Sequence, residues 1–182
     1  EITGFLQKRR LPHMVVGGLA NMAWGSARLT QDIDISVALP ETAMDSILTD
    51  LAEAGFAILP DEPEAFLART KVLPIKSANG TRIDLILALL PIEKTAISRA
   101  MPIKLDRMEI PVCTPEDLII MKAVSTRAKD ADDIDGIVER IGDRLDLDYL
   151  LPIIRGLTAL LERPDLDALC QRIAKIGRSP NS

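Results

Sequence analysis

Residues 32–38 alternate between polar and apolar side chains, and this short segment constrains the chain more than any other. Asp32, Asp34 and Ser36 fall on one face of an extended chain, and β-branched residues fall on the other. The alternation predicts a half-buried strand on which two carboxylates stand side by side. Such a pair repels itself unless a divalent cation lies between the oxygens, and hard oxygen ligands favour Mg²⁺ or Mn²⁺ over zinc. The alternative is an ordinary solvated strand face.

A Gly-Gly step precedes this strand. Residues 14–16 form a short apolar run that predicts a strand, Gly17 and Gly18 follow it, and residues 19–24 predict a short helix. Glycine lets the backbone approach a ligand closely, and the free N–H groups of a helix N-terminus attract phosphate. We therefore expect a phosphate-binding turn next to the carboxylates, and the alternative is a plain turn.

A third carboxylate is expected on another strand. Asp84 is the only acid in the apolar run of residues 82–87, and an acid buried alone is costly unless it is paired or bound to a metal. We predict that Asp84 joins Asp32 and Asp34 as a ligand of the same cation. Pairing with Arg82 is the alternative.

The remaining periodicities predict an α/β (α+β) fold: a small mixed, mostly antiparallel sheet with flanking helices and a helical C-terminal part. Asn79-Gly80 predicts a hairpin, and Thr114-Pro115 predicts a helix start. Residues 1–112 are expected to form the catalytic part, and residues 113–182 a helical part packed on it. The other expected elements are helices at 2–6, 41–54, 114–126, 130–141, 146–161 and 165–176, a turn at 61–64, and strands at 56–59, 70–75 and 108–112.

Composition excludes several classes. Only five of the 182 residues are aromatic and the net charge is −5, so a general nucleic-acid binder with aromatic stacking platforms is disfavoured. The longest apolar run, near residues 85–90, is far shorter than the roughly 20 residues of a membrane span. Cys113 and Cys170 are too far apart in the sequence for a zinc motif, and we interpret them as reduced thiols of a cytoplasmic protein.

Taken together, Gly17-Gly18, the Asp32-Ile33-Asp34 triplet and the later Asp84 resemble the nucleotidyltransferase superfamily related to DNA polymerase beta. The segment from Arg28 to Asp34 is most similar to the AbiEii-type toxins and the minimal nucleotidyltransferases. The helix from Lys122 to Ile134, with Arg127, Lys129 and an Asp-rich end, resembles the third motif of the AbiEii-type group.

The resemblance implies a role for each residue. Asp32, Asp34 and Asp84 are expected to hold Mg²⁺ or Mn²⁺, with Asp84 also activating the acceptor, and Lys122 to neutralise phosphate charge as a fourth catalytic residue. The residues implied in nucleotide binding are Gly17, Gly18, Arg28, Thr30, Lys129 and Asp130. For Lys122 the alternative is a surface lysine, and for Lys129, Asp130 and Asp133 it is local ion pairing.

The implied reaction transfers a nucleoside monophosphate from a nucleoside triphosphate such as ATP to a hydroxyl acceptor on RNA, a tRNA end or a protein. The same resemblance implies a toxin role with an antitoxin partner. Two alternatives stay open: a non-catalytic module of the same fold that binds a nucleotide or a partner, and a small-molecule, antibiotic-type nucleotidyltransferase. The sequence does not define the oligomeric state.

Overall fold

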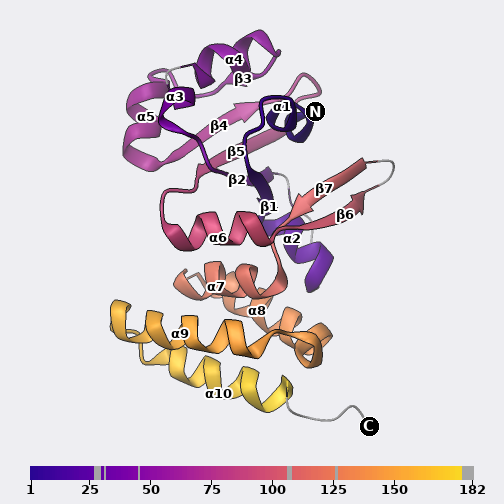
Figure 1. Ribbon diagram of the computed structural model, residues 1–182, viewed down its shortest axis with the longest axis vertical. Coiled ribbons are helices and arrows are strands. Elements are labelled where there is room, and N and C mark those ends of the chain that lie inside the picture. The colour runs from indigo at the N-terminus through magenta and orange to yellow at the C-terminus, as the bar shows by residue number, and fades with distance from the viewer. Residues whose placement is uncertain (27–29, 31, 45, 106–107, 126, 178–182) are drawn as a thin grey trace. The chain divides into compact units, whose positions relative to one another are not determined.

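The computed structural model describes residues 1–26, 30, 32–44, 46–105, 108–125 and 127–177, and it contains one mixed sheet (Figure 1). Its seven described strands are β1 His13–Val16, β2 Asp32–Val37, β3 Ala57–Ile58, β4 Val72–Lys76, β5 Arg82–Leu87, β6 Met101–Leu105 and β7 Met108–Val112. They lie in the order β3-β4-β5-β2-β1-β7-β6. Four of the six pairings are antiparallel, whereas β2 with β5 and β1 with β7 are parallel. The predicted mixed, mostly antiparallel sheet is confirmed.

The described chain divides into two compact units. One comprises Glu1–Ala20 and Leu29–Cys113, and the other comprises Asn21–Arg28 and Thr114–Ser182. The first unit contains the sheet with helices α1 Ile2–Lys8, α3 Glu41–Met44, α4 Ile47–Glu53, α5 Pro63–Thr70 and α6 Pro91–Arg99. Helix α2, Gly17–Trp24, begins in the first unit and continues into the second after Ala20. The predicted assignment of residues 1–112 to catalysis stays a prediction.

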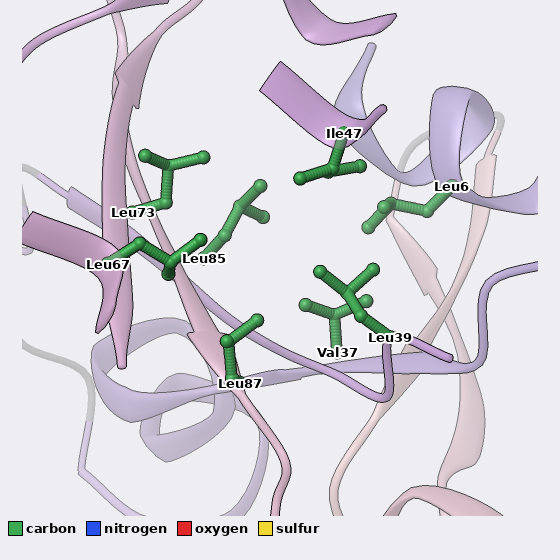
Figure 2. A pocket seen from close by; sticks show the side chains of 8 residues that line it. All are labelled: Leu6, Val37, Leu39, Ile47, Leu67, Leu73, Leu85 and Leu87. Carbon is green, nitrogen blue, oxygen red and sulfur yellow. The ribbon is translucent and has the colours of Figure 1, made fainter. Parts of the chain in front are cut away.

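One face of the sheet forms the core of the first unit. Leu73, Leu85 and Val37 on three neighbouring strands are almost fully buried, and α1, α4 and α5 supply the apolar side chains opposite them. Figure 2 shows eight such side chains around a small void, all of them hydrocarbon. The void of about 10 Å³ offers no polar partner, so it is a gap in core packing rather than a ligand site.

The second unit is helical. Its elements are α7 Pro115–Val124, α8 Ala128–Ile141, the 3₁₀ turn η1 Gly142–Arg144, α9 Leu147–Leu161 and α10 Asp165–Gly177. Thr114 caps α7 as predicted, because its Oγ1 accepts a hydrogen bond from the Asp117 N–H at 3.1 Å. Both cysteines are buried and free. Among the described helices, none is both long and apolar enough to cross a membrane.

Several element predictions were wrong. The expected helix 41–54 is interrupted between α3 and α4, the expected turn 61–64 opens α5, and the predicted strand 70–75 begins only at Val72. Helix α6 and strand β6 were not predicted. Helices α5 and α6, neither of which was predicted, both carry proline at their first position, a known start signal. In α6 the Glu93 carboxylate also accepts hydrogen bonds from the Leu89 and Leu90 N–H groups at 2.8 Å.

Candidate active site

The three predicted carboxylates lie on the same face of the sheet, opposite the apolar core. Strands β2 and β5 run parallel in register, so Asp34 lies directly beside Asp84, and Asp32 lies beside Arg82. Neighbouring strands are about 4.8 Å apart and alternate residues of one strand about 6.6 Å apart. The three carboxylates therefore start from neighbouring positions on one face.

Asp84 is less buried than the sequence suggested. Its side chain is 21% exposed, because the strand alternates and presents this face outward between buried Ile83 and Leu85. The argument from a lone buried acid is therefore corrected. Asp84 is also not alone, since Arg82 Nε donates a hydrogen bond to its Oδ1 at 3.2 Å.

Arg82 is a residue of this face that the sequence reasoning treated only as an alternative partner of Asp84. Its pKa is raised, first by the hydrogen bond and charge of Asp84 and then by the charges of Asp32 and Asp34. The guanidinium thus interacts with all three carboxylates of the site. Its position two residues before Asp84 on the same strand face is the signal that could have identified this role.

The glycine turn is shaped around Asp34. Gly17 has a φ of +63°, and a Cβ built there would lie 1.9 Å from Asp34 Oδ2 and 2.9 Å from Asp34 Cβ. Strand β1 places this turn next to Asp34, because Val16 is the register partner of Asp34. Glycine is therefore required here to admit the carboxylate, in addition to any ligand.

Thr30 lies against the second glycine. A Cβ on Gly18 would approach Thr30 Cβ and Oγ1 to 2.8 Å, and Thr30 Oγ1 donates to the Asp32 carbonyl at 3.0 Å. The structure thus joins Gly17, Gly18, Thr30 and the carboxylates in one unit. Arg28, predicted to flank the phosphates, lies outside the described residues.

The remaining predicted residues belong to the second unit and form a buried ionic cluster. Lys122 Nζ donates to Asp133 Oδ2 at 2.5 Å and to Asp130 Oδ1 at 3.1 Å. Asp130 also accepts from Arg127 Nε at 2.6 Å. Lys122 is therefore not a surface lysine, since it is 6% exposed, whereas Lys129 is exposed.

Hydrogen bonding controls the ionisation of Asp130. Burial alone raises the pKa of a carboxyl group, but hydrogen bonds from Ser125, Arg127 and Lys122 outweigh it and lower the pKa of Asp130 to about 2. Asp130 is consequently charged at neutral pH and fixes the Lys122 ammonium.

The residue types on the carboxylate face suit a divalent cation, but their present positions do not form a complete binding site. Three partly exposed carboxylates on adjacent positions are hard oxygen ligands of the kind that Mg²⁺ or Mn²⁺ prefers. Within the described part of the chain, however, no three His, Cys, Asp or Glu side chains are grouped closely enough to hold an ion as they stand. Asp84 engages Arg82 instead.

The chain matches one known protein family. The sequence profile of a family described as "Nucleotidyl transferase of unknown function" matches residues 1–165. No curated protein matches the chain.

Three solved structures share the fold at low identity. The lincosamide antibiotic adenylyltransferase LnuA, lincomycin-bound, is 13% identical with a TM-score of 0.51 over 75% of this chain and 91% of that chain. An antigenic nucleotidyltransferase-like protein from Paracoccidioides brasiliensis is 16% identical with a TM-score of 0.52 over 93% and 88%. The antibiotic-resistance factor ANT(2'')-Ia is 16% identical with a TM-score of 0.57 over 88% and 91%. Identities this low establish the fold alone.

Proposed function

The chain belongs to this nucleotidyl transferase family, and from that premise we propose that it transfers a nucleoside monophosphate from a nucleoside triphosphate to a hydroxyl group, with Mg²⁺ or Mn²⁺ as cofactor. The observation that carries the proposal is the register of β2 and β5, in which Asp34 lies beside Asp84 and Asp32 shares their face. The glycine turn at Asp34 is the second supporting feature.

In the proposed reaction the acceptor oxygen attacks the α-phosphorus. A new O–P bond forms, the bond from the α-phosphorus to the bridging oxygen breaks, and pyrophosphate leaves. Asp84 accepts the hydroxyl proton. Asp32, Asp34 and Asp84 would hold a divalent ion, which would supply charge stabilisation for the triphosphate. The protein contributes position and charge rather than a covalent intermediate.

Arg82 has a specific place in this proposal. Its guanidinium pairs with Asp84 and partly offsets the repulsion among three carboxylates. Asp84 would hold the cation with the same carboxylate that now pairs with Arg82. A guanidinium no longer paired with Asp84 would carry a positive charge next to the site, where it could pair with a phosphate oxygen of the substrate.

The other residues that we propose for nucleotide binding are Gly17, Gly18, Arg28, Thr30, Lys129 and Asp130. The glycines and Thr30 support this best, because they meet at the carboxylate face. Asp130 is engaged by Lys122 and Arg127, so its contribution is to order α8 rather than to contact a base. Lys129 is exposed at the start of that helix.

The acceptor that we propose is a hydroxyl of an RNA end or of a protein, in keeping with the similarity to AbiEii-type toxins and a toxin–antitoxin role. A second candidate is a small antibiotic-type alcohol. It is favoured by LnuA, described as a lincosamide antibiotic adenylyltransferase, and by ANT(2'')-Ia, described as an antibiotic-resistance factor, each matched over 91% of its length. A non-catalytic module is disfavoured, because all three carboxylates are present.

The test is incubation with each triphosphate, labelled at the α-phosphate, and Mg²⁺. Separate reactions contain total RNA, lysate protein, and a panel of aminoglycosides and lincosamides. We expect label in one acceptor class and release of pyrophosphate. Asp34→Asn should abolish transfer, whereas Asp61→Asn at an exposed position before α5 should match the wild type. Label in no acceptor, or transfer by Asp34→Asn at the wild-type rate, would contradict the proposal.

A further inference from the structure

The second unit contains a cavity to which the proposed transfer reaction assigns no ligand. The end of α7, the start of α8 and helix α10 surround it, and its volume is about 440 Å³. Sites for small molecules typically measure about 300–1,000 Å³. All of its lining residues belong to the second unit, so that unit alone defines the cavity.

One side of the cavity, which we call its floor, is apolar. The floor consists of Ile134 from α8 and of Leu166 and Leu169 from α10, none of them more than 9% exposed. Ala131 on α8 and Ala168 on α10 also line the cavity, and their short, exposed side chains leave the space above the floor open. A ligand would place hydrocarbon against this floor, because a polar group buried there without a partner is unfavourable.

Positive charge surrounds the floor. Among the described lining residues, four side chains are cationic and a single one, Asp165, is anionic. The cations are Lys122, Arg127, Arg163 and Arg172. The whole chain has a net charge of −5, so the charge excess of this lining is opposite in sign to that of the protein. The lining therefore favours an anionic ligand.

The carboxylate partners of these cations lie mostly outside the lining. Asp130, Asp133 and Asp135 each pair with one or two of the cations and do not line the cavity, whereas Asp165 does. The charges nearest to a ligand are therefore mostly positive. Because the Coulomb energy falls with distance, these nearest charges contribute most to ligand binding.

Arg127 is oriented to bind an anion. Its Nε donates to Asp130 Oδ2 at 2.6 Å and to Ser125 Oγ at 3.1 Å, and these bonds fix the plane of the guanidinium. The side chain is nevertheless 64% exposed. Neither Nη1 nor Nη2 makes a hydrogen bond within the described part of the chain, so this pair of nitrogens can donate to the two oxygens of a carboxylate.

We propose that this cavity binds a small organic anion with a hydrocarbon body. The body packs on the floor, and the anionic head pairs with Arg127 and the other lining guanidinium groups. A nucleotide fits less well, because the polar edges of a base find few partners on this floor and none of the described lining residues is an aromatic stacking platform. The proposal goes beyond the transfer reaction and does not depend on it.

The first test uses the full chain and the fluorescence of 8-anilinonaphthalene-1-sulfonate, an anion with an aromatic hydrocarbon body. We expect saturable binding. Ala131→Trp and Ala168→Trp fill the cavity from its two sides, so each should raise the Kd at least about tenfold. Ala159→Trp is the matched control, since Ala159 is exposed on α9 and does not line the cavity, and its Kd should equal that of the wild type. Wild-type Kd in both filled variants would overturn the proposal.

The second test asks whether the site selects negative charge. The compounds 1-naphthoate, 1-naphthamide and 1-naphthylmethylammonium share one ring system and differ in charge. Naphthoate should displace the probe at a concentration about tenfold or more below that of the ammonium compound. Arg127→Gln and Arg172→Gln should each weaken naphthoate binding about threefold or more and leave naphthamide binding unchanged. Arg144→Gln is the control, because Arg144 is exposed and lies outside the lining.

Equal displacement by the three compounds, or an equal loss of naphthoate binding in Arg144→Gln, would overturn the selection of an anion. AMP should displace the probe less effectively than naphthoate. Stronger displacement by AMP would show a nucleotide site and overturn the assignment of a hydrocarbon body.

Calorimetry with naphthoate repeats the measurement without the fluorescent probe, because that probe also binds partly unfolded chains. Ala168→Trp should lose naphthoate binding at an unchanged urea midpoint, and Ala131→Trp replaces it if it does not fold. Absence of saturable naphthoate binding by the wild type would overturn the proposal, whatever the transfer assay shows.

Discussion

Replacing Gly17 by alanine tests how the site is built, because the structure separates two costs of the change. The first is conformational: Gly17 has a φ of +63°, and a left-handed backbone costs an L-residue about 1–2 kcal/mol. The second is a collision. The new Cβ would lie 1.9 Å, 2.7 Å and 2.9 Å from Asp34 Oδ2, Cγ and Cβ, so rotating the carboxylate does not remove it. Overpacking of this kind adds about 1–3 kcal/mol.

Gly55→Ala is the control that isolates the collision. Gly55 has a φ of +88° but nothing within 4 Å of a built Cβ, so this variant carries only the conformational cost. Urea unfolding should show Gly17→Ala less stable than wild type by about 2–5 kcal/mol and Gly55→Ala by about 1–2 kcal/mol. Displacement of Asp34 should also lower transfer about 100-fold in Gly17→Ala alone. Equal stability and equal activity of the two variants would refute the close approach of Gly17 and Asp34.

Four further outcomes are expected. Lys122→Met removes the buried ammonium that Asp130 and Asp133 share, so urea unfolding should show a loss of about 3–5 kcal/mol, and a loss below 1 kcal/mol would argue against the buried cluster. The pKa of Asp130 falls from 3.8 to about 2 on folding, so ionised Asp130 contributes about 2 kcal/mol to the free energy of unfolding. This contribution is complete above pH 3.8 and is lost as the pH falls from 3.8 to 2. Asp130→Asn should therefore flatten that part of the profile of stability against pH. Burial lowers the pKa of His13 below 6.5 despite its hydrogen bond to the Leu11 carbonyl, so the contribution of neutral His13 to stability is complete above pH 6.5 and declines below it. This single histidine should titrate below pH 6.5 by NMR, and a midpoint above 6.5 would contradict its burial. Thr114→Ala removes the cap of α7 and should cost about 1 kcal/mol by thermal unfolding, whereas Thr81→Ala, at a half-buried position that caps no helix, should cost less.

The sequence predicted the carboxylate face because its signal is local. Alternation over residues 32–38 and the isolated acid at Asp84 each fix a face of one strand, and the parallel register of β2 and β5 brings them together. Parallel pairing itself was not predictable, since no local pattern specifies which strands become neighbours. The degree of exposure of Asp84 was misjudged for the same reason.

The hydrogen bond between Asn21 of α2 and Asp133 of α8 could not be predicted from the sequence pattern. Asn21 is 112 positions from its partner Asp133, and a single asparagine in a short helix carries no periodic signal. The need for glycine at position 136 could not be predicted either, because it depends on the close approach of Ser26, which is distant in the sequence. Helices α5 and α6 were missed although Pro63 and Pro91 marked their starts, because both helices are short and weakly apolar.

The measurement that tests the central claim most directly is a Mn²⁺ titration followed by electron paramagnetic resonance, with ATP present. Wild-type protein should bind Mn²⁺ with an affinity that Asp34→Asn and Asp84→Asn each reduce at least about tenfold, while Asp61→Asn leaves it unchanged. Identical Mn²⁺ affinity in all four proteins would contradict a shared cation site on the face of β2 and β5.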